Sequence, residues 1–258
     1  MHTTQQKFEE TAIIIKQEEI ADDIYSMWLH TEQIAAHAKA GQFVSVYCKE
    51  GSRLLPRPIS ICEIDRKDGA LRLVYRVAGK GTEEFSSMHT GMQLKVIGPL
   101  GNGFPKQEKK AFLIGGGIGI PPMLELAKEL NCEKQIVLGY RDELFLLDEF
   151  RKQGEAYIAT EDGSVGTEGN VLDAIRENGL TADVIYACGP LPMLRALKEY
   201  AAKEGIECWI SMEERMACGI GACLACVCKS TEKDAHSNVK NKRVCKEGPV
   251  FRAEEVDF

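Results

Sequence analysis

The stretch from residue 112 to residue 130 reads FLIGGGIGIPPMLELAKEL and indicates the class of the central fold. Its apolar opening is typical of a buried strand, and its glycines are typical of a tight turn. The remainder of the stretch is typical of a helix. A strand that passes through glycines into a helix is the first half of a βαβ unit. We therefore predict an α/β domain here.

The chain beyond this stretch keeps alternating between strand-like and helix-like segments. Strands are expected at 135–140, 156–160, 183–190 and 207–211, and helices at 142–150, 169–178 and 191–205. Strands that alternate with helices imply a parallel sheet covered on both faces.

The chain before this stretch has a different pattern. β-Rich segments recur at 11–20, 24–30, 41–48, 56–64, 71–79 and 92–100, separated by Gly and Asp. Many short strands with little helix predict an antiparallel barrel. One short helix is expected within 79–92, opened by Thr82, and the Gly- and Pro-rich segment GPLGNGFP (98–105) is expected to be a linker.

Four cysteines toward the C-terminus have a distinctive spacing. ERMACGIGACLACVCK (214–229) contains Cys218, Cys223 and Cys226, and Cys245 follows. C-x4-C-x2-C…C is the spacing of a plant-type [2Fe–2S] site, whereas zinc sites typically use two close pairs a dozen or more residues apart. We predict a [2Fe–2S] cluster on these four residues, with Cys228 pointing away from Cys226.

These patterns predict an α+β multidomain protein of 258 residues. The expected modules are an antiparallel barrel at 1–102, a nucleotide-binding α/β domain at 103–212 and a small cluster module at 213–258. The polar stretch 229–242 is expected to form a solvated loop or hairpin.

Composition argues against several classes of function. The net charge is -7 without a basic patch, which disfavours nucleic acid, and no apolar run approaches the roughly 18–20 residues of a membrane helix. The polar start MHTTQQKFEE does not resemble a signal peptide. Five of the ten cysteines stand singly in apolar contexts, which favours free thiols in a reducing cytoplasm: Cys48, Cys62, Cys132, Cys188 and Cys208.

Two glycine-bearing strand ends are candidates for binding a nucleotide. The first carries Gly115, Gly116, Gly117 and Gly119, and the second carries Cys188, Gly189 and Pro190, followed by Met193. Glycines and a helix N-terminus suit a pyrophosphate, but a tight β–α turn without a ligand is the alternative. Arg141 would suit a 2′-phosphate and Asp142 would suit NAD, so the choice between NAD and NADP stays open.

The barrel segment carries a second group of candidate residues. Arg57, Pro58, Ile59 and Ser60 begin one strand, Val74, Tyr75 and Arg76 end another, and Gly81 and Thr82 lie at the expected helix. An arginine can pair with a phosphate, and a serine hydroxyl can reach a flavin ring nitrogen. Together they can hold a flavin nucleotide, although an Arg-Pro-Ile-Ser run alone is more often a simple strand entry.

These motifs in this order resemble the ferredoxin–NADP reductase superfamily. The cysteine module narrows the resemblance to the electron-transfer subunits of class B dihydroorotate dehydrogenases, and the resemblance covers essentially the whole chain. It implies FAD at 57–60, 74–76 and 81–82, NAD at the glycine turn and at 188–190, and the cluster on the four cysteines. It also implies a partner, an FMN-containing catalytic subunit that oxidises dihydroorotate in pyrimidine biosynthesis, in a heterotetramer of two plus two.

The three cofactors form a logical electron path. Nicotinamide accepts a hydride, an iron–sulfur cluster passes single electrons, and a flavin does both. We therefore expect electrons to run from the cluster through FAD to NAD+, with Cys188 near the nicotinamide and no substrate-binding catalytic residue in this chain. The alternatives are the small subunit of an NAD-dependent ferredoxin:NADP oxidoreductase or hydrogenase-type diaphorase, and a zinc-stabilised nucleotide-sensing interaction module.

Overall fold

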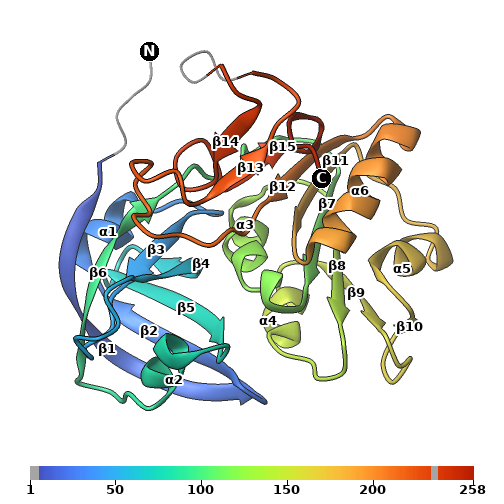
Figure 1. The fold of residues 1–258 in the computed structure, drawn as a ribbon. Helices are drawn as coiled ribbons and strands as arrows, with labels where there is room; N and C mark the ends of the chain where they lie inside the picture. Colours follow the sequence, from blue (N-terminus) through green and yellow to red (C-terminus); the bar gives the residue numbers. More distant parts are fainter. Residues whose placement is uncertain (1–5, 234–237) are drawn as a thin grey trace.

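The computed structural model describes residues 6–233 and 238–258. A barrel formed by the N-terminal part lies beside a mixed sheet with helices, and the C-terminal segment runs over both (Figure 1). No helix in these described ranges is long and apolar enough to cross a membrane.

The N-terminal part forms the antiparallel barrel that the sequence predicted. Its closed strand order is β1-β2-β5-β4-β3-β6. Side chains alternate along the first strand, where Ala12 and Ile14 are buried and Ile13 and Ile15 are exposed. The strands are β1 (Phe8–Ala21), β2 (Ile24–His30), β3 (Phe43–Val46), β4 (Arg57–Asp65), β5 (Ala70–Arg76) and β6 (Gln93–Leu100).

The helices around the barrel differ from the prediction. Helix α1 (Glu32–His37) was not expected. Helix α2 (Lys80–Ser86) begins after Gly79, so Thr82 is its third residue and not its first. The Thr82 hydroxyl accepts the Ala78 N–H at 2.9 Å and thus closes the turn that enters the helix. The expected linker at 98–105 is also shorter, because residues 98–100 still pair as the end of β6.

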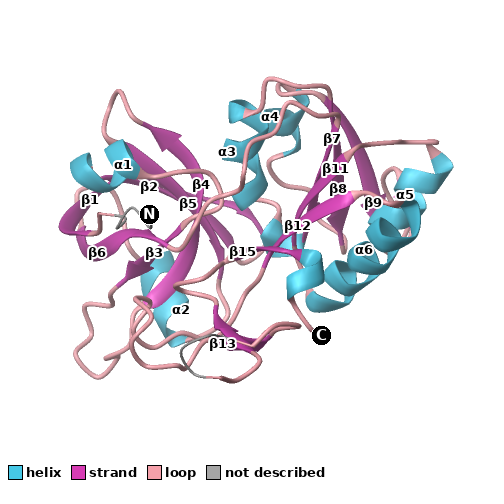
Figure 2. Cartoon of the chain, turned by 90° about the horizontal axis from the view of Figure 1, so that it is seen from above, coloured by secondary structure: helices cyan, strands magenta, loops and turns pink. Residues whose placement is uncertain are grey.

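The second part is the predicted α/β unit. Its sheet has the order β10-β9-β8-β7-β11-β12-β15, and the first six strands are parallel. Helices α3 and α4 cover one face and α5 and α6 the other (Figure 2), which confirms a sheet covered on both faces. The elements are β7 (Ala111–Gly116), the 3-10 turn η1 (Gly117–Gly119), α3 (Pro122–Glu129), β8 (Lys134–Tyr140), α4 (Leu147–Arg151), β9 (Glu155–Thr160), β10 (Thr167–Glu168), α5 (Val171–Glu177), β11 (Val184–Cys188), α6 (Leu191–Glu204) and β12 (Glu207–Ser211).

The helix expected at 142–150 is wrong over its first half. Leu146 has a left-handed backbone with φ 60°, so α4 begins only at Leu147. The Tyr140 hydroxyl donates to the Phe145 carbonyl at 2.9 Å and holds the preceding loop. The apolar residues Phe145 and Leu146 are buried although they lie in a loop. Apolar composition alone does not distinguish such a loop from a helix.

The C-terminal segment is not a separate appendage. Strands β13 (Val227–Lys229) and β14 (Asn241–Arg243) form a hairpin in the polar stretch, of which residues 234–237 lie outside the described ranges. Strand β15 (Val250–Arg252) then pairs antiparallel with β12 and completes the seven-stranded sheet, followed by the turn η2 (Ala253–Glu255). This added strand was not predicted from the sequence.

Asn102 joins the end of the barrel to this segment. Its amide nitrogen donates to the carbonyls of Val250 at 2.8 Å and Glu247 at 3.1 Å, and its amide oxygen accepts the Val250 N–H at 2.9 Å. The Asn102 amide therefore satisfies both backbone groups of Val250, the N–H and the carbonyl, as a neighbouring strand would.

A buried ionic network joins the barrel to the α/β unit. Glu63 on β4 accepts hydrogen bonds from Arg72 on β5 at 2.5 Å and from Lys128 on α3. Arg72 also donates to the Ser26 hydroxyl at 2.8 Å. Since both charges of the central pair are almost fully buried, the network specifies how α3 sits against the barrel.

Glu207, at the start of β12, gives a pH-dependent prediction. The hydrogen bond from Lys109, aided by those from Gln107 and Trp209, lowers its pKa from 4.5 to about 2, against the opposing effect of burial. A carboxylate with a depressed pKa stabilises the fold above its unfolded-state pKa, and this contribution is lost as pH falls through the folded-state pKa. We expect Glu207→Gln to lower the free energy of unfolding at pH 7 by about 1–2 kcal/mol, measured by urea unfolding.

The loss caused by Glu207→Gln should shrink when unfolding is measured at about pH 3, below the unfolded-state value of 4.5. The matched control is Glu133→Gln, because Glu133 pairs with Lys110 through a side chain that is 66% exposed. An equal loss at both pH values would contradict the role assigned to the ionised carboxylate.

Candidate functional site

The cysteine loop is wound by residues with left-handed backbones. Gly219, Gly221 and Leu224 have φ angles of 67°, 88° and 59°. The loop is pressed onto the barrel, since a Cβ on Gly219 would lie 2.8 Å from the Ser45 hydroxyl oxygen of β3. The tight winding turns backbone N–H groups inward, and Ala222 donates to the Cys218 sulfur at 3.3 Å.

The four predicted ligands lie in two contacting pairs. Cys218 is hydrogen-bonded to Cys223, and Cys226 to Cys245, whose N–H also donates to the Cys226 sulfur at 3.4 Å. Within the described ranges, no three His, Cys, Asp or Glu side chains converge to hold a single metal ion. Two thiol pairs suit a cluster in which each of two irons takes two cysteine sulfurs.

The surroundings of the two pairs shift the cysteine pKa values in opposite directions. Burial acts to raise the pKa of Cys218, but hydrogen bonds from Ile220, Cys223 and Ala222 outweigh it and lower the pKa to about 6. Burial and the neighbouring Cys226 raise the pKa of Cys245 to about 12. Of the two, the Cys218 sulfur is therefore the one whose surroundings favour the thiolate.

Cys228 lies apart from both pairs. It is buried on β13, and its sulfur contacts the Lys242 carbonyl oxygen across the hairpin at 3.5 Å. Its contacts are those of a core thiol.

The flavin-binding candidates of the barrel meet at the start of α2. The Arg57 side chain packs directly on Gly81, where a Cβ would lie 2.1 Å from Arg57 Nε. Arg57 also donates to the Leu55 carbonyl, and half-buried Ser60 lies on the same strand. A guanidinium held over the first turn of a helix is suited to a phosphate group.

Tyr75 is placed differently from the other candidates. Its ring is 3% exposed and packs edge-on against Phe85 inside the barrel. Of its neighbours in the motif, Val74 packs in the interdomain core and Arg76 is exposed. This motif therefore offers a ligand its backbone and Arg76, but not the aromatic face of Tyr75.

The two glycine-bearing strand ends pack against each other. A Cβ on Gly119 would lie 2.5 Å from the Cys188 carbonyl atoms. Cβ atoms on Gly116 and Gly189 would lie 2.6 and 2.4 Å from the Met193 thioether group. Only glycines permit this approach, so the backbones of β7 and β11 are brought together at one edge of the sheet.

The flavin and nicotinamide candidates face each other. Strand β5 of the barrel contacts η1 of the glycine turn. Cys188 lies at this junction, half-buried and hydrogen-bonded to Ser211, and burial raises the pKa of its thiol to about 12. A neutral thiol at this place adds no charge to the junction.

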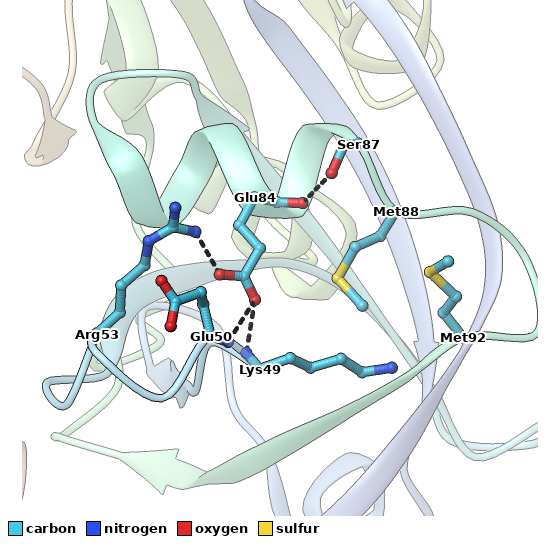
Figure 3. Close-up of a pocket in the computed structure, with 7 residues that line it drawn as sticks. All are labelled: Lys49, Glu50, Arg53, Glu84, Ser87, Met88 and Met92. Atoms are coloured by element: carbon cyan, nitrogen blue, oxygen red, sulfur yellow. Dashed lines mark hydrogen bonds and ion pairs between the residues drawn. The ribbon is translucent and has the colours of Figure 1, made fainter.

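A pocket beside α2 contains residues that the sequence did not single out. It lies between the β3–β4 loop and the end of α2 (Figure 3) and is lined by Lys49, Glu50, Arg53, Glu84, Ser87, Met88 and Met92. Arg53 and Glu84 form an ion pair across 31 residues of sequence, a separation with no periodic signal.

Comparison with known families agrees with this geometry. Residues 11–104 match the family model described as the oxidoreductase FAD-binding domain. Residues 213–257 match the model of the iron–sulfur cluster binding domain of dihydroorotate dehydrogenase B.

Curated relatives extend the match to the whole chain. The dihydroorotate dehydrogenase B (NAD(+)) electron transfer subunit of Fusobacterium nucleatum subsp. nucleatum is 44% identical over 254 residues, covering 93% of this chain and 95% of the relative. The subunit of the same name from Geobacillus thermodenitrificans is also 44% identical, covering 96% and 98%. The chain belongs to this family of dihydroorotate dehydrogenase B electron transfer subunits.

Solved structures of other oxidoreductases share the fold of this chain. A chain of the NADH-dependent reduced ferredoxin-NADP oxidoreductase, solved in work on flavin-based electron bifurcation, matches with a TM-score of 0.86 and 30% identity, covering 100% of this chain and 91% of that one. The cytochrome P450 reductase GcoB of Amycolatopsis matches with a TM-score of 0.65 and 23% identity over 78% and 67%, which shows a shared fold.

Proposed function

We propose that the chain carries electrons from dihydroorotate oxidation in a partner subunit through a [2Fe–2S] cluster and FAD to NAD+. The observation that carries this proposal is the gathering of four cysteines into two pairs, three of them on a loop that packs against the FAD-binding barrel. The position of the loop supports a short path from the cluster to the flavin.

The proposed cluster ligands are Cys218, Cys223, Cys226 and Cys245, one pair for each iron. A structural zinc site needs four ligands around one point, and two separate pairs do not favour it. The N–H groups around Cys218 would stabilise the negative charge of the cluster sulfurs.

The proposed FAD residues are those around the start of α2. Arg57 would hold the pyrophosphate over Gly81, while Pro58 and Ile59 set the strand that brings Ser60 toward the flavin ring. The remaining contacts are assigned to Val74, Tyr75, Arg76 and Thr82, with Tyr75 acting through its backbone. Bound FAD supplies the exchange between one-electron and two-electron transfer.

The proposed nicotinamide site is the junction of β7 and β11. Gly115, Gly116, Gly117 and Gly119 would admit the cofactor to the backbone, with Cys188, Gly189, Pro190 and Met193 on the other side. The contact between β5 and η1 supports placing the nicotinamide against the flavin, as hydride transfer requires.

The proposed partner is an FMN-containing catalytic subunit, in a complex of two copies of each chain. Electrons must enter at the cluster, and the loop around exposed Cys223 presents Ile220 and Leu224, which are 47% and 60% exposed. Exposed apolar side chains at the electron entry support docking at this face. All ten cysteines are free thiols, which supports our proposal of a cytoplasmic location.

We also propose the division into modules at 1–102, 103–212 and 213–258. The end of β6 supports the first boundary and the end of β12 the second. Strand β15 returns to the sheet, so the third module would share its core with the second.

Purification of the chain with its partner under anaerobic conditions tests the proposed function. We expect about two irons, two sulfides and one FAD per chain, together with dihydroorotate-dependent reduction of NAD+. Zinc without sulfide would refute the cluster. Co-purification with a large subunit that carries flavin and [4Fe–4S] clusters, together with ferredoxin-linked activity, would contradict this function. It would favour the small subunit of a ferredoxin-NADP oxidoreductase instead.

A further inference from the structure

The buried network between the barrel and the α/β unit contains two crossed contacts between opposite charges. Glu63 on β4 accepts a hydrogen bond from Lys128 of α3. Arg72, which pairs with Glu63 on β5, has its guanidinium 3.5 Å from the Glu149 carboxylate of α4. We call these two contacts between the parts the ionic clamp. Because a barrel anion meets a cation and a barrel cation meets an anion, sliding one part past the other weakens both contacts at once.

A third contact ties α3 to the backbone of the barrel. Strand β3 pairs with β4 along residues 57–60. Further along β4, the Ile64 N–H donates at 2.9 Å to the Glu125 carboxylate of α3, and Glu125 is only 3% exposed. The carboxylate takes the place of a strand partner while α3 packs along β4. Since a buried N–H without a partner is costly, this bond fixes the position of α3 along the strand.

The opposite end of α3 follows the glycine turn of the proposed nicotinamide site. Helix α3 lies between the barrel and the parallel sheet (Figures 1 and 2), and only Ile120 and Pro121 separate it from η1. At 1.5 Å per residue, its eight residues make it about 12 Å long. Ile120 is fully buried, and a Cβ on Gly115 would lie 2.8 Å from its Cα. The clamped end and the glycine turn are therefore the two ends of one short, tightly packed element.

The barrel side of the clamp lies on a strand that carries proposed flavin residues. Arg72 precedes Val74 by two residues on β5, which is about 7 Å along a strand. Val74 packs in one buried cluster with Ile120 and Met123, and β5 also contacts η1. The clamp therefore joins the strand proposed to hold the flavin to the helix that begins at the glycine turn.

We propose that Lys128 and Glu149 are positioning residues for hydride transfer, because the ionic clamp sets how the nicotinamide meets the flavin. The inference rests on the flavin and nicotinamide sites proposed above. From NADH to FAD, the C–H bond at C4 of the nicotinamide breaks, and its hydrogen and both electrons pass to N5 of the flavin, which leaves NAD+ and FADH−. The reacting atoms must lie about 3–3.5 Å apart, and a 1 Å misplacement caused far from the chemistry can cost about 100-fold in rate.

The test is the reduction of FAD by NADH in the anaerobic complex with the partner, followed by stopped-flow absorbance. Lys128→Met and Glu149→Gln are the test variants, because these side chains are 39% and 37% exposed and the buried Glu63–Arg72 pair keeps its own bond in both. At saturating NADH, we expect each variant to slow flavin reduction at least about tenfold, with less than about twofold change in the Kd for NADH or FAD. The long-wavelength absorbance of reduced flavin stacked on NAD+ should fall as well, because it requires contact between the rings.

Two further variants separate positioning from a general effect of charge. Lys128→Arg keeps a cation opposite Glu63 and should restore the rate to within about threefold of the wild-type value. Lys203→Met is the matched control, because it makes the same exchange in the last turn of α6 that Lys128→Met makes in the last turn of α3. Lys203 is exposed and lies outside the clamp, so flavin reduction should keep the wild-type rate.

Two results would overturn the proposal: wild-type rates of flavin reduction in both test variants, or slower reduction that is matched by an equal loss of affinity for FAD or NADH. The second result would mean that the network supports binding and not positioning. Circular dichroism identifies a variant that has lost its fold, and the other variant then decides the result. A wild-type complex in which NADH does not reduce FAD would instead refute the proposed function itself.

Discussion

Cys223→Ser is expected to remove the iron–sulfur cluster while leaving the flavin in place. Cys223 is the exposed member of the pair formed with Cys218, so its loss leaves one iron with a single thiolate. Even residues that only support metal ligands change affinity or activity by about 10–100-fold, so loss of a ligand should lower dihydroorotate-dependent NAD+ reduction at least about 100-fold. Visible absorption, iron and sulfide should fall together.

Cys228→Ser is the matched control for this experiment. It makes the same exchange of sulfur for oxygen five residues further along the chain, on β13, where Cys228 contacts the Lys242 carbonyl and not the thiol pairs. Iron content and NAD+ reduction should stay close to the wild-type values. Oxidation of NADH by an artificial acceptor, which needs only FAD, should survive in both variants. Cluster loss in Cys228→Ser alone would show that the ligand set is misassigned.

Gly119→Ala is expected to disrupt nicotinamide binding. The added Cβ would lie 2.5 Å from the Cys188 carbonyl and 2.6 Å from the Gly189 Cα, and both contacts are backbone. Backbone cannot rotate away as a side chain does, so β7 and β11 must separate at the sheet edge. Overpacking of this kind costs about 1–3 kcal/mol, and we expect the KM for NADH to rise at least about tenfold.

Gly154→Ala, in the turn that precedes β9, gives the matched control. Its added Cβ would meet Lys134 at 3.4 Å, an ordinary van der Waals contact, outside the proposed site. The KM for NADH should not change, and bound iron and FAD should be the same in both variants. An unaltered KM in Gly119→Ala would place the nicotinamide elsewhere.

The fold was predictable where local pattern determines it. Side chains alternate between buried and exposed along the first barrel strand, as Ala12 to Ile15 illustrate, and the parallel strands β7, β8 and β11 are each followed by a helix. The spacing of the cysteines predicts one shared site for four of them, and the loop that carries three of these cysteines is wound by Gly219 and Gly221. These signals reside in neighbouring residues.

The remaining features depend on contacts between distant residues. The helix expected at 142–150 starts late because Tyr140 holds the Phe145 carbonyl, a bond that sequence periodicity does not encode. The Arg53–Glu84 pair that shapes the pocket, and the burial of the Tyr75 ring, likewise depend on how barrel strands and α2 meet. Such contacts leave no repeating pattern in the sequence.

The late addition of β15 constrains the order in which the protein matures. Until residues 250–252 have been synthesised, β12 presents an open sheet edge that invites pairing with another chain. Chains fold from the N-terminus during synthesis, so barrel and parallel strands precede the strand that covers this edge. Cys245 lies just before that strand. It is the last of the four cysteines to be synthesised, and it therefore reaches Cys226 as the sheet closes. Closing the sheet edge and bringing the last of the four proposed ligands to Cys226 therefore coincide in time.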